Sequence, residues 1–245
     1  MNILNKTVLI TGGGSGIGFE TARLLSEKGN RVIITGRNQD RLEKAASQLT
    51  NTTAIACDIT VEADVKKLVG QVQEKFSDLS ILINNAGTAY AYQLAAGASA
   101  FDKAGEEMST NYLSMIRLTE LLLPVLNKQK QAAIVNVSSI VVFAAAGRIP
   151  TYSASKAAVH SYTQSLRHAL SKSTNIKVFE LMPPLVNTDL SKEIGGENGI
   201  PPREVAEGLL SGLDKDEYEI HVVATAQIYQ LFLSSPQNAF TALNQ

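Results

Sequence analysis

The 245-residue sequence has little of several features that mark particular classes of protein. Its single cysteine, Cys57, has no second cysteine to pair with, which excludes a disulfide scaffold and is compatible with a reducing compartment. Neither charge is in excess, because 22 basic and 23 acidic side chains give a formal net charge of −1. A chain without a basic surplus is poorly suited to bind a phosphate backbone, which disfavours nucleic acid as a partner.

Long apolar runs are also missing. The run 8–10 is too short for the core of a signal peptide, and the uncharged stretch 79–101 contains asparagines, a glutamine and glycines that would cross a bilayer badly. We therefore expect a cytoplasmic protein with no membrane partner. The chain is 44% hydrophobic and 18% charged, which is enough apolar material for a large core. No repeat or low-complexity linker divides it, so we expect one domain over residues 1–245.

Short apolar segments alternate with segments of helical period along most of the chain. Strands are predicted over residues 6–11, 31–35, 53–57, 80–84, 132–138 and 175–181, with a weaker seventh at 219–223. Helices are predicted over residues 17–28, 40–49, 61–76, 109–126, 152–172 and 202–213. This alternation predicts an α/β fold with a doubly wound, mostly parallel seven-stranded sheet and helices on both faces.

A glycine-rich turn, Thr11–Gly18, separates the first predicted strand from the first helix. Glycines allow a tight turn and a close approach to a pyrophosphate, and the helix after them offers unpaired N–H groups. The spacing G-x-x-x-G-x-G is neither the common dinucleotide pattern nor a nucleoside-triphosphate loop, and a plain turn is the alternative. Its place after the opening strand favours a Rossmann-type dinucleotide site, with contacts from Gly12, Ser15, Gly16, Ile17 and Gly18.

The end of the second predicted strand indicates which dinucleotide. An acidic residue there would bind the adenosine ribose and repel a 2′-phosphate, but the chain has Arg37 two residues after Thr35. The guanidinium is a planar, permanently charged fork that suits phosphate, although a solvated loop arginine is the alternative. NADP(H) is therefore favoured as the cofactor, and NAD(H) remains open.

Tyr152 and Lys156 open a predicted helix four residues apart, so they share one helical face. A free tyrosine has a pKa of about 10, and a neighbouring cation favours its phenolate. The pair therefore has a route to acid–base chemistry, although this spacing on its own is usually a surface accident.

Other motifs accompany this pair. Asn84-Asn85-Ala86-Gly87 ends one predicted strand, Ser138-Ser139 ends another, and Asn111 begins a helix. With the glycine turn, this combination closely resembles the short-chain dehydrogenase/reductase (SDR) family, in its branch of single-domain chains of about 250 residues. The resemblance runs from Lys6 to about Thr188.

The resemblance implies four catalytic residues. Tyr152 would be the general acid in carbonyl reduction, or the base in the reverse direction, and Lys156 would lower its pKa and bind the nicotinamide ribose. Ser139 would hydrogen-bond the substrate oxygen, and Asn111 would help to hold a water-linked proton path. Ser138 is the main rival to Ser139, but the thirteen-residue spacing to Tyr152 favours Ser139.

The resemblance also implies cofactor contacts near the carboxyl ends of the strands. Those residues are Asp58 near the adenine, and Asn84, Ala86, Gly87, Tyr152, Lys156, Val186 and Thr188. The alternative for each asparagine or serine is that it satisfies buried backbone groups, a frequent role for these residues. Five motifs in the order of the family favour the functional interpretation.

The chain departs from the family pattern in two places. Pro184 stands where a glycine is usual, and it removes an N–H and fixes φ. The C-terminal part lacks a glycine-rich ending and is similar to a subgroup of bacterial oxidoreductases that includes one encoded beside teichoic-acid D-alanylation genes.

The remaining titratable residues do not suggest a metal site. His160 and His168 are eight residues apart on one helix, about 12 Å along its axis, and a surface or interface role is expected for them. Cys57 is expected to be a buried small residue. By resemblance, the helices with Asn111 and Tyr152 also build a homodimer or homotetramer.

The expected substrate pocket is largely apolar. Residues 140–146 would supply an apolar wall that includes Phe143, residues 89–100 contribute small side chains, and residues 189–202 would form a mobile substrate loop. The predicted function is NADP(H)-dependent hydride transfer between nicotinamide and a small, fairly apolar carbonyl or secondary alcohol. The alternatives are a catalytically silent dinucleotide-binding regulator on the same fold and a structural oligomer without a ligand.

Overall fold

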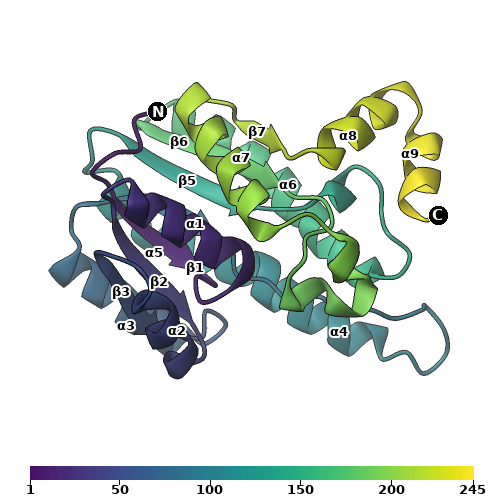
Figure 1. The fold of residues 1–245 in the computed structure, drawn as a ribbon, viewed down its shortest axis with the longest axis horizontal. Helices are drawn as coiled ribbons and strands as arrows, with labels where there is room; N and C mark the ends of the chain where they lie inside the picture. Colours follow the sequence, from purple (N-terminus) through teal and green to yellow (C-terminus); the bar gives the residue numbers. More distant parts are fainter.

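Seven parallel strands form one sheet in the computed structural model, which describes residues 1–245 (Figure 1). The strands are β1 (Thr7–Thr11), β2 (Arg31–Gly36), β3 (Thr52–Ala56), β4 (Leu79–Asn84), β5 (Ala132–Val137), β6 (Ile176–Met182) and β7 (Glu219–His221). Their order is β3-β2-β1-β4-β5-β6-β7, and it reverses between β1 and β4, the place where open α/β sheets bind ligands. The predicted doubly wound α/β fold is confirmed.

Helices cover both faces of the sheet. One face carries α1 (Gly16–Glu27), α2 (Gln39–Ala46) and α7 (Pro202–Lys215), with α1 and α7 side by side (Figure 1). The other carries α3 (Glu62–Lys75), α5 (Ser114–Leu126) and α6 (Pro150–Ser171). Because successive strand residues point to opposite faces, each strand feeds both cores. On β2, for example, Ile34 packs under α1 and α2 whereas Ile33 packs under α3.

The helices before α5 differ from the prediction. A single helix was expected over residues 109–126, but the chain forms α4 (Ala100–Glu107), one wide π-helical turn η1 (Met108–Leu113) and then α5. Such turns arise where an extra residue is accommodated within a helix, and they often lie at functional sites. Asn111 lies within this turn.

The C-terminal region contains two helices that were not predicted, α8 (Ala224–Ser234) and α9 (Pro236–Leu243). They form the yellow pair at the edge of the molecule in Figure 1. Short 3₁₀ turns complete the fold: η2 (Ile140–Val142), η3 (Asp189–Ile194) and η4 (Gly196–Asn198). No helix has the length and apolar character needed to span a membrane.

Candidate active site

The glycine turn ends in a cluster of free backbone donors. The N–H groups of residues 14–18 donate to no acceptor within the chain, and α1 begins without a side-chain cap or an acidic residue in its first turn. Gly12 has φ +67°, and a Cβ at Gly18 would lie 2.3 Å from the Gly12 carbonyl oxygen, so both positions require glycine. Free donors at a helix N-terminus fit the pyrophosphate of a dinucleotide.

Arg37 and Asp58 are the residues expected at the adenosine end of a dinucleotide. Arg37 is exposed just after β2, where no acidic side chain follows the strand. Burial alone would raise the pKa of Asp58, but hydrogen bonds from the Thr60 N–H and hydroxyl and the charge of Arg37 lower it. An ionised Asp58 and a free guanidinium are therefore available together at this end.

Tyr152 and Lys156 lie in the first two turns of α6, and both are buried. The Lys156 Nζ donates to the Val137 carbonyl oxygen at 2.7 Å and lies 5.6 Å from the centroid of the Tyr152 ring. Ser139 comes two residues after β5 ends, and its side chain lies near enough to Tyr152 to lower the pKa of that phenol. The strand end and the helix thus bring together the three residues of the expected acid–base site.

Burial dominates the protonation of this group. It raises the pKa of Tyr152 to about 12, with the nearby Ser139 side chain acting against the rise and the Glu107 charge adding to it. It lowers the pKa of Lys156 to about 8, against the charge of Glu180. The direction at Tyr152 is opposite to the lowering expected from Lys156, because removal of the phenol from water is the largest effect on its pKa and Lys156 is not among the groups that shift it.

Asn111 is fixed by the backbone beside it. Its Oδ1 accepts from the Thr88 N–H at 2.8 Å, and its Nδ2 donates to the Thr88 carbonyl and to the Ser155 hydroxyl, both at 2.9 Å. A Cβ at Gly87 would lie 3.2 Å from the Asn111 Oδ1 and 3.7 Å from the Lys156 Nζ. Gly87 therefore lets Asn111 and Lys156 approach the same point.

A small cavity adjoins this contact. It has a volume of about 10 Å³ and is lined by polar atoms of Asn84, Thr110, Asn111 and Ser114 together with apolar side chains. The Asn84 Oδ1 is buried and has no hydrogen-bond partner. A cavity of this size and polarity fits one water molecule.

The side chains of Ser138 and Asn84 hydrogen-bond residues outside the expected acid–base site. The Ser138 hydroxyl donates to the Glu180 carboxylate, which is buried and also contacts His160 on α6. The Asn84 Nδ2 donates to the Asn136 Oδ1 at 2.8 Å and to the Thr119 hydroxyl at 3.1 Å. Of the two serines, only Ser139 acts on the pKa of Tyr152.

Three titratable residues beside the site were not singled out as site residues by sequence reasoning. Glu107 and Glu180 are fully buried, and His160, expected on a surface or at an interface, bonds Glu180 through its Nδ1. Burial raises the pKa of Glu107, whose Oε1 accepts from the Tyr90 N–H. For Glu180 the sequence offered one signal. It is a glutamate among the apolar residues of the predicted strand 175–181, where an unpaired charge is costly and a buried partner is therefore expected.

The segment after β6 lies over the glycine turn. A Cβ at Gly16 would be 3.1 Å from the Thr188 Cγ2, and Asp189 forms an ion pair with Arg41 on α2. Thr188 and Ser191 cap η3 reciprocally, while Val186 is buried and forms an isolated bridge with Ile200. Residues 189–200 are therefore mostly folded into η3 and η4.

Pro184, the departure from the family pattern, does not prevent the preceding residue from bonding. The carbonyl oxygen of Pro183 accepts from the Ile140 N–H.

An apolar cluster surrounds Tyr152. It contains Ile140, Val141 and Ile149, with Ala89, Ala91, Ala146, Ile194, Ile228 and Leu243 packed against it. Phe143, which was expected in the pocket wall, instead contacts His221, Tyr229 and Phe232 at centroid distances of 5.4, 4.8 and 5.9 Å. These contacts attach α8 to the segment between Ser139 and Tyr152.

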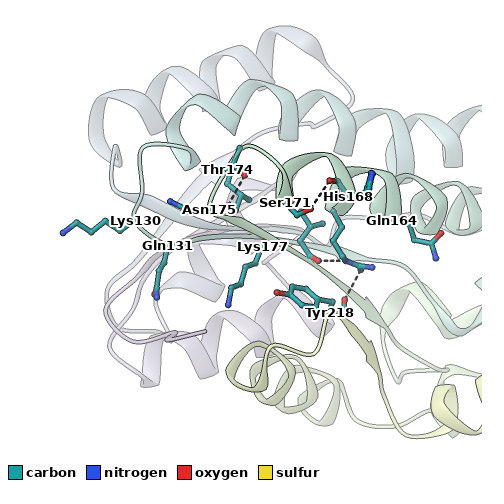
Figure 2. A pocket seen from close by; sticks show the side chains of 12 residues that line it. Lys130, Gln131, Gln164, His168, Ser171, Thr174, Asn175, Lys177 and Tyr218 are labelled. Atoms are coloured by element: carbon teal, nitrogen blue, oxygen red, sulfur yellow. Dashed lines mark hydrogen bonds between the residues drawn. The ribbon is translucent and has the colours of Figure 1, made fainter.

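A separate groove of about 730 Å³ lies at the opposite edge of the sheet (Figure 2). It is lined by polar and basic residues at the start of β5 and β6 and the end of α6, including Lys130, His168 and Tyr218. It contains none of the residues of the expected acid–base site. No group of three or more His, Cys, Asp or Glu side chains is placed to hold a metal ion.

Related sequences show the family of the chain. Residues 6–199 match the family described as short chain dehydrogenase. The chain is 37% identical over 225 residues to the uncharacterised oxidoreductase DltE of Bacillus subtilis (strain 168), covering 90% of this chain and 89% of that protein. It is 30% identical over 220 residues to the uncharacterised oxidoreductase SAR2567 of Staphylococcus aureus (strain MRSA252), covering 88% and 94%.

Solved structures share the fold over 90% or more of this chain. A short chain dehydrogenase from Burkholderia cenocepacia J2315, in complex with NADP, has a TM-score of 0.88 at 25% identity, with 100% of each chain covered. A short chain dehydrogenase/reductase from Burkholderia phymatum, in complex with NAD, has a TM-score of 0.84 at 20% identity over 90% and 89% of the chains and supports the fold alone. With its family match over most of its length, this chain belongs to the short-chain dehydrogenase family of oxidoreductases.

Proposed function

We propose that the protein is an NADP(H)-dependent oxidoreductase that moves a hydride between nicotinamide and a small, fairly apolar carbonyl or secondary alcohol. The observation that carries the proposal is the meeting of Ser139, Tyr152, Lys156 and Asn111 at the carboxyl ends of the strands. The free N–H groups of residues 14–18, in the turn after β1, supply a pyrophosphate site. A silent regulator would need only the second of these features.

The bound cofactor supplies or accepts the hydride. Ser139 donates a hydrogen bond to the carbonyl oxygen and stabilises the negative charge that develops there. Tyr152 then donates its proton to that oxygen. Because burial raises the pKa of Tyr152 to about 12, the phenol is protonated near neutral pH and has a proton to donate.

Lys156 and Asn111 complete the assignment. Lys156, whose pKa burial lowers to about 8, is mostly protonated at neutral pH and can bind the nicotinamide ribose while stabilising negative charge on the Tyr152 oxygen. Asn111 and the small cavity beside it can hold a water that returns a proton from solvent.

The remaining cofactor contacts are assigned to the three parts of the dinucleotide. We assign the pyrophosphate to Gly12, Ser15, Gly16, Ile17 and Gly18, the adenosine to Arg37 and Asp58, and the nicotinamide side to Asn84, Ala86, Gly87, Val186 and Thr188. The buried side chain of Asn84 restricts its part to the backbone, with the side chain holding Asn136. The segment 189–202 is assigned as the substrate loop.

The preference for NADP(H) rests on Arg37. It is exposed after β2, where an acid would otherwise repel a 2′-phosphate, and a neighbour of similar fold was solved with NADP. Arg37→Ala should weaken NADPH binding about tenfold or more and leave NADH binding within about twofold. Lys75→Ala, the loss of an exposed cation at the end of α3, is the control. Equal weakening of both cofactors would remove the role of Arg37.

The activity itself is tested with a panel of aliphatic and aromatic aldehydes, ketones and secondary alcohols, with NADPH and NADH. Turnover that is lost in Tyr152→Phe supports the proposal. NADPH binding by calorimetry without turnover of any compound would favour the silent regulator, and absence of binding would favour the structural oligomer.

The expected assembly is a homodimer or homotetramer, which light scattering after size exclusion would measure. The single domain and the cytoplasmic location also stay predictions. A single cooperative unfolding transition is the expected sign of one domain.

A further inference from the structure

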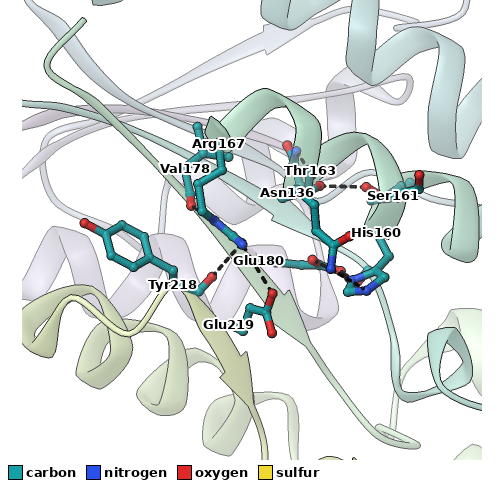
Figure 3. A network of polar contacts seen from close by, with 12 residues as sticks. Asn136, His160, Ser161, Thr163, Arg167, Val178, Glu180, Tyr218 and Glu219 are labelled. Atoms are coloured by element: carbon teal, nitrogen blue, oxygen red, sulfur yellow. Dashed lines mark hydrogen bonds and ion pairs between the residues drawn. The ribbon is translucent and has the colours of Figure 1, made fainter. Parts of the chain in front are cut away.

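A row of polar side chains crosses the sheet under α5 and α6. Asn84, Asn136, Glu180 and Glu219 are neighbours in register on β4, β5, β6 and β7. Each bonds a helix: Asn84 reaches Thr119 on α5, and the other three reach Thr163, His160 and Arg167 on α6. Figure 3 shows the part of this row that faces α6.

Glu180 is the member of the row that is both charged and fully buried. Its carboxylate accepts from the Ser138 hydroxyl, and its Oε1 and Oε2 lie 3.1 and 3.0 Å from the His160 Nδ1. Glu219, by comparison, is partly exposed and pairs with Arg167 at 3.2 Å. A buried carboxylate is stable only when it has such partners. For the stability of the fold alone, an apolar residue at this position of β6 would serve at least as well.

Both partners of Glu180 are attached to residues of the proposed acid–base site. Ser138 precedes Ser139 in the chain, and His160 lies one helical turn after Lys156 on α6. The carboxylate therefore joins the end of β5 to the helix that carries Tyr152 and Lys156. No other side chain bonds both Ser138 and α6.

We propose that Glu180 is a positioning residue for the hydride-transfer reaction, holding Ser139 in register with Tyr152 and Lys156 through Ser138 and His160. This inference rests on the function proposed above. Glu180 acts through its neighbours and touches neither substrate nor cofactor.

The charge of Glu180 adds a second effect. Burial lowers the pKa of Lys156 to about 8, and the Glu180 carboxylate opposes that lowering. The other titratable groups around the cluster are Tyr152, close to Lys156 on α6, Glu107 on α4, which acts on Tyr152, Arg167 further along α6, and Glu219 and His221 on β7. Without the carboxylate, Lys156 should lose its proton at lower pH.

The first test follows Lys156 directly and needs no substrate. The protein is labelled with ¹³C-lysine, the Lys156 Cε signal is assigned with Lys156→Arg, and its titration is compared between the wild type and Glu180→Gln. We expect Lys156 to titrate at lower pH in Glu180→Gln. Glu219→Gln, which removes the next carboxylate in the row and leaves Ser138 bonded, should titrate as the wild type does. Identical titrations for the wild type and Glu180→Gln would overturn the electrostatic part.

The second test separates kcat from KM, with 4-nitrobenzaldehyde and NADPH as probes. In Glu180→Gln we expect kcat to fall about tenfold at pH 8, less at pH 6, with KM for NADPH within about threefold. A merely structural defect lowers kcat equally at every pH. Ser138→Ala should lower kcat without moving the Lys156 titration, because the charge remains.

The outcomes separate this inference from the proposed function. If the wild type neither binds NADPH nor reduces any carbonyl, the proposed function fails, and the Lys156 titration still reports the effect of Glu180. If the wild type is active and Glu180→Gln matches it in kcat at pH 6 and 8, the inference is overturned. Should Glu180→Gln not fold by circular dichroism, Ser138→Ala decides: an unchanged kcat overturns the positioning role.

Discussion

The two faces of the sheet are built alike at the amino ends of the strands and differently at the carboxyl ends. Toward α1 and α7 the strands stay apolar to their ends, with Val137 and Leu181 as the last inward residues of β5 and β6. Toward α5 and α6 the apolar residues give way to Asn84, Asn136 and Glu180. The two faces therefore differ in role, because one supplies core packing throughout and the other carries polar side chains under the residues of the proposed site.

The polar residues are placed where they add least to stability and lie beside the proposed site. Buried polar groups contribute little net stability even when satisfied, and cost more when a partner is lost. On the α6 face these buried polar groups lie next to Tyr152 and Lys156, where a fixed side-chain orientation is useful for catalysis. Substitutions on the two faces should consequently differ in which property they change.

The largest effect is expected on activity from the polar face. Tyr152→Phe removes the proton donor and should lower kcat about 10²- to 10⁴-fold, with little change in the free energy of unfolding. Tyr162→Phe on the same helix makes the same chemical change in a half-buried tyrosine and should retain most of the turnover. Steady-state kinetics measure both. Full turnover by Tyr152→Phe would contradict the assignment.

The opposite result is expected from the apolar face. Phe179 is fully buried under α7 and stacks on Tyr218 at 5.2 Å. Phe179→Ala should reduce the free energy of unfolding by about 3–5 kcal/mol, measured by urea titration, because it leaves a cavity in the core. The residual folded enzyme should keep its pH profile. A change in that profile would show that the two faces are coupled.

A smaller effect should follow from breaking one bond of the polar row. The Thr163 hydroxyl accepts from the Asn136 Nδ2 at 2.9 Å, and Thr163→Val keeps the shape while leaving that donor unpaired. We expect a loss of about 1–3 kcal/mol in the free energy of unfolding. Stability equal to the wild type would mean that a water or a rearranged Asn136 replaces the hydroxyl.

The smallest expected effect is the pH dependence contributed by His160. Its hydrogen bond to Glu180 raises the pKa of His160 above the ordinary value of 6.5, against burial. A pKa raised by folding adds stability that is full below about pH 6.5 and is lost as the pH rises through the folded value. The stability of the wild type minus that of His160→Gln should fall over this range by no more than about 1 kcal/mol. A difference that grows with pH would contradict the ion pair.

Much of the architecture could be predicted because β-strand and helix periodicity dominate the first 180 residues. The apolar strands and the glycine turn follow from local sequence, and strand bounds differ from the structure by at most two residues. The π-helical turn at Asn111 could not be read this way, since its residues have ordinary helical character and the widening accompanies the bonds of Asn111 to the Thr88 backbone. Helices α8 and α9 depend on distant contacts such as Phe143 with Tyr229.

The candidate site was predictable as a set of motifs but not in its electrostatics. The motifs indicated Ser139, Tyr152 and Lys156, which the fold places together. Their protonation depends on burial and on Glu107 and Glu180, which come from α4 and β6, far apart in sequence. Which charged side chains lie near Tyr152 and Lys156 depends on how the strands and helices pack, and the sequence alone does not show this.

The free amide groups of residues 14–18 also bear on how the protein is handled. Unpartnered donors at a helix start attract any small oxyanion, and inorganic phosphate or sulfate offers the same oxygens as a pyrophosphate. We expect such salts to compete with the dinucleotide, so titrations in phosphate buffer would understate its affinity and zwitterionic amine buffers are the better choice.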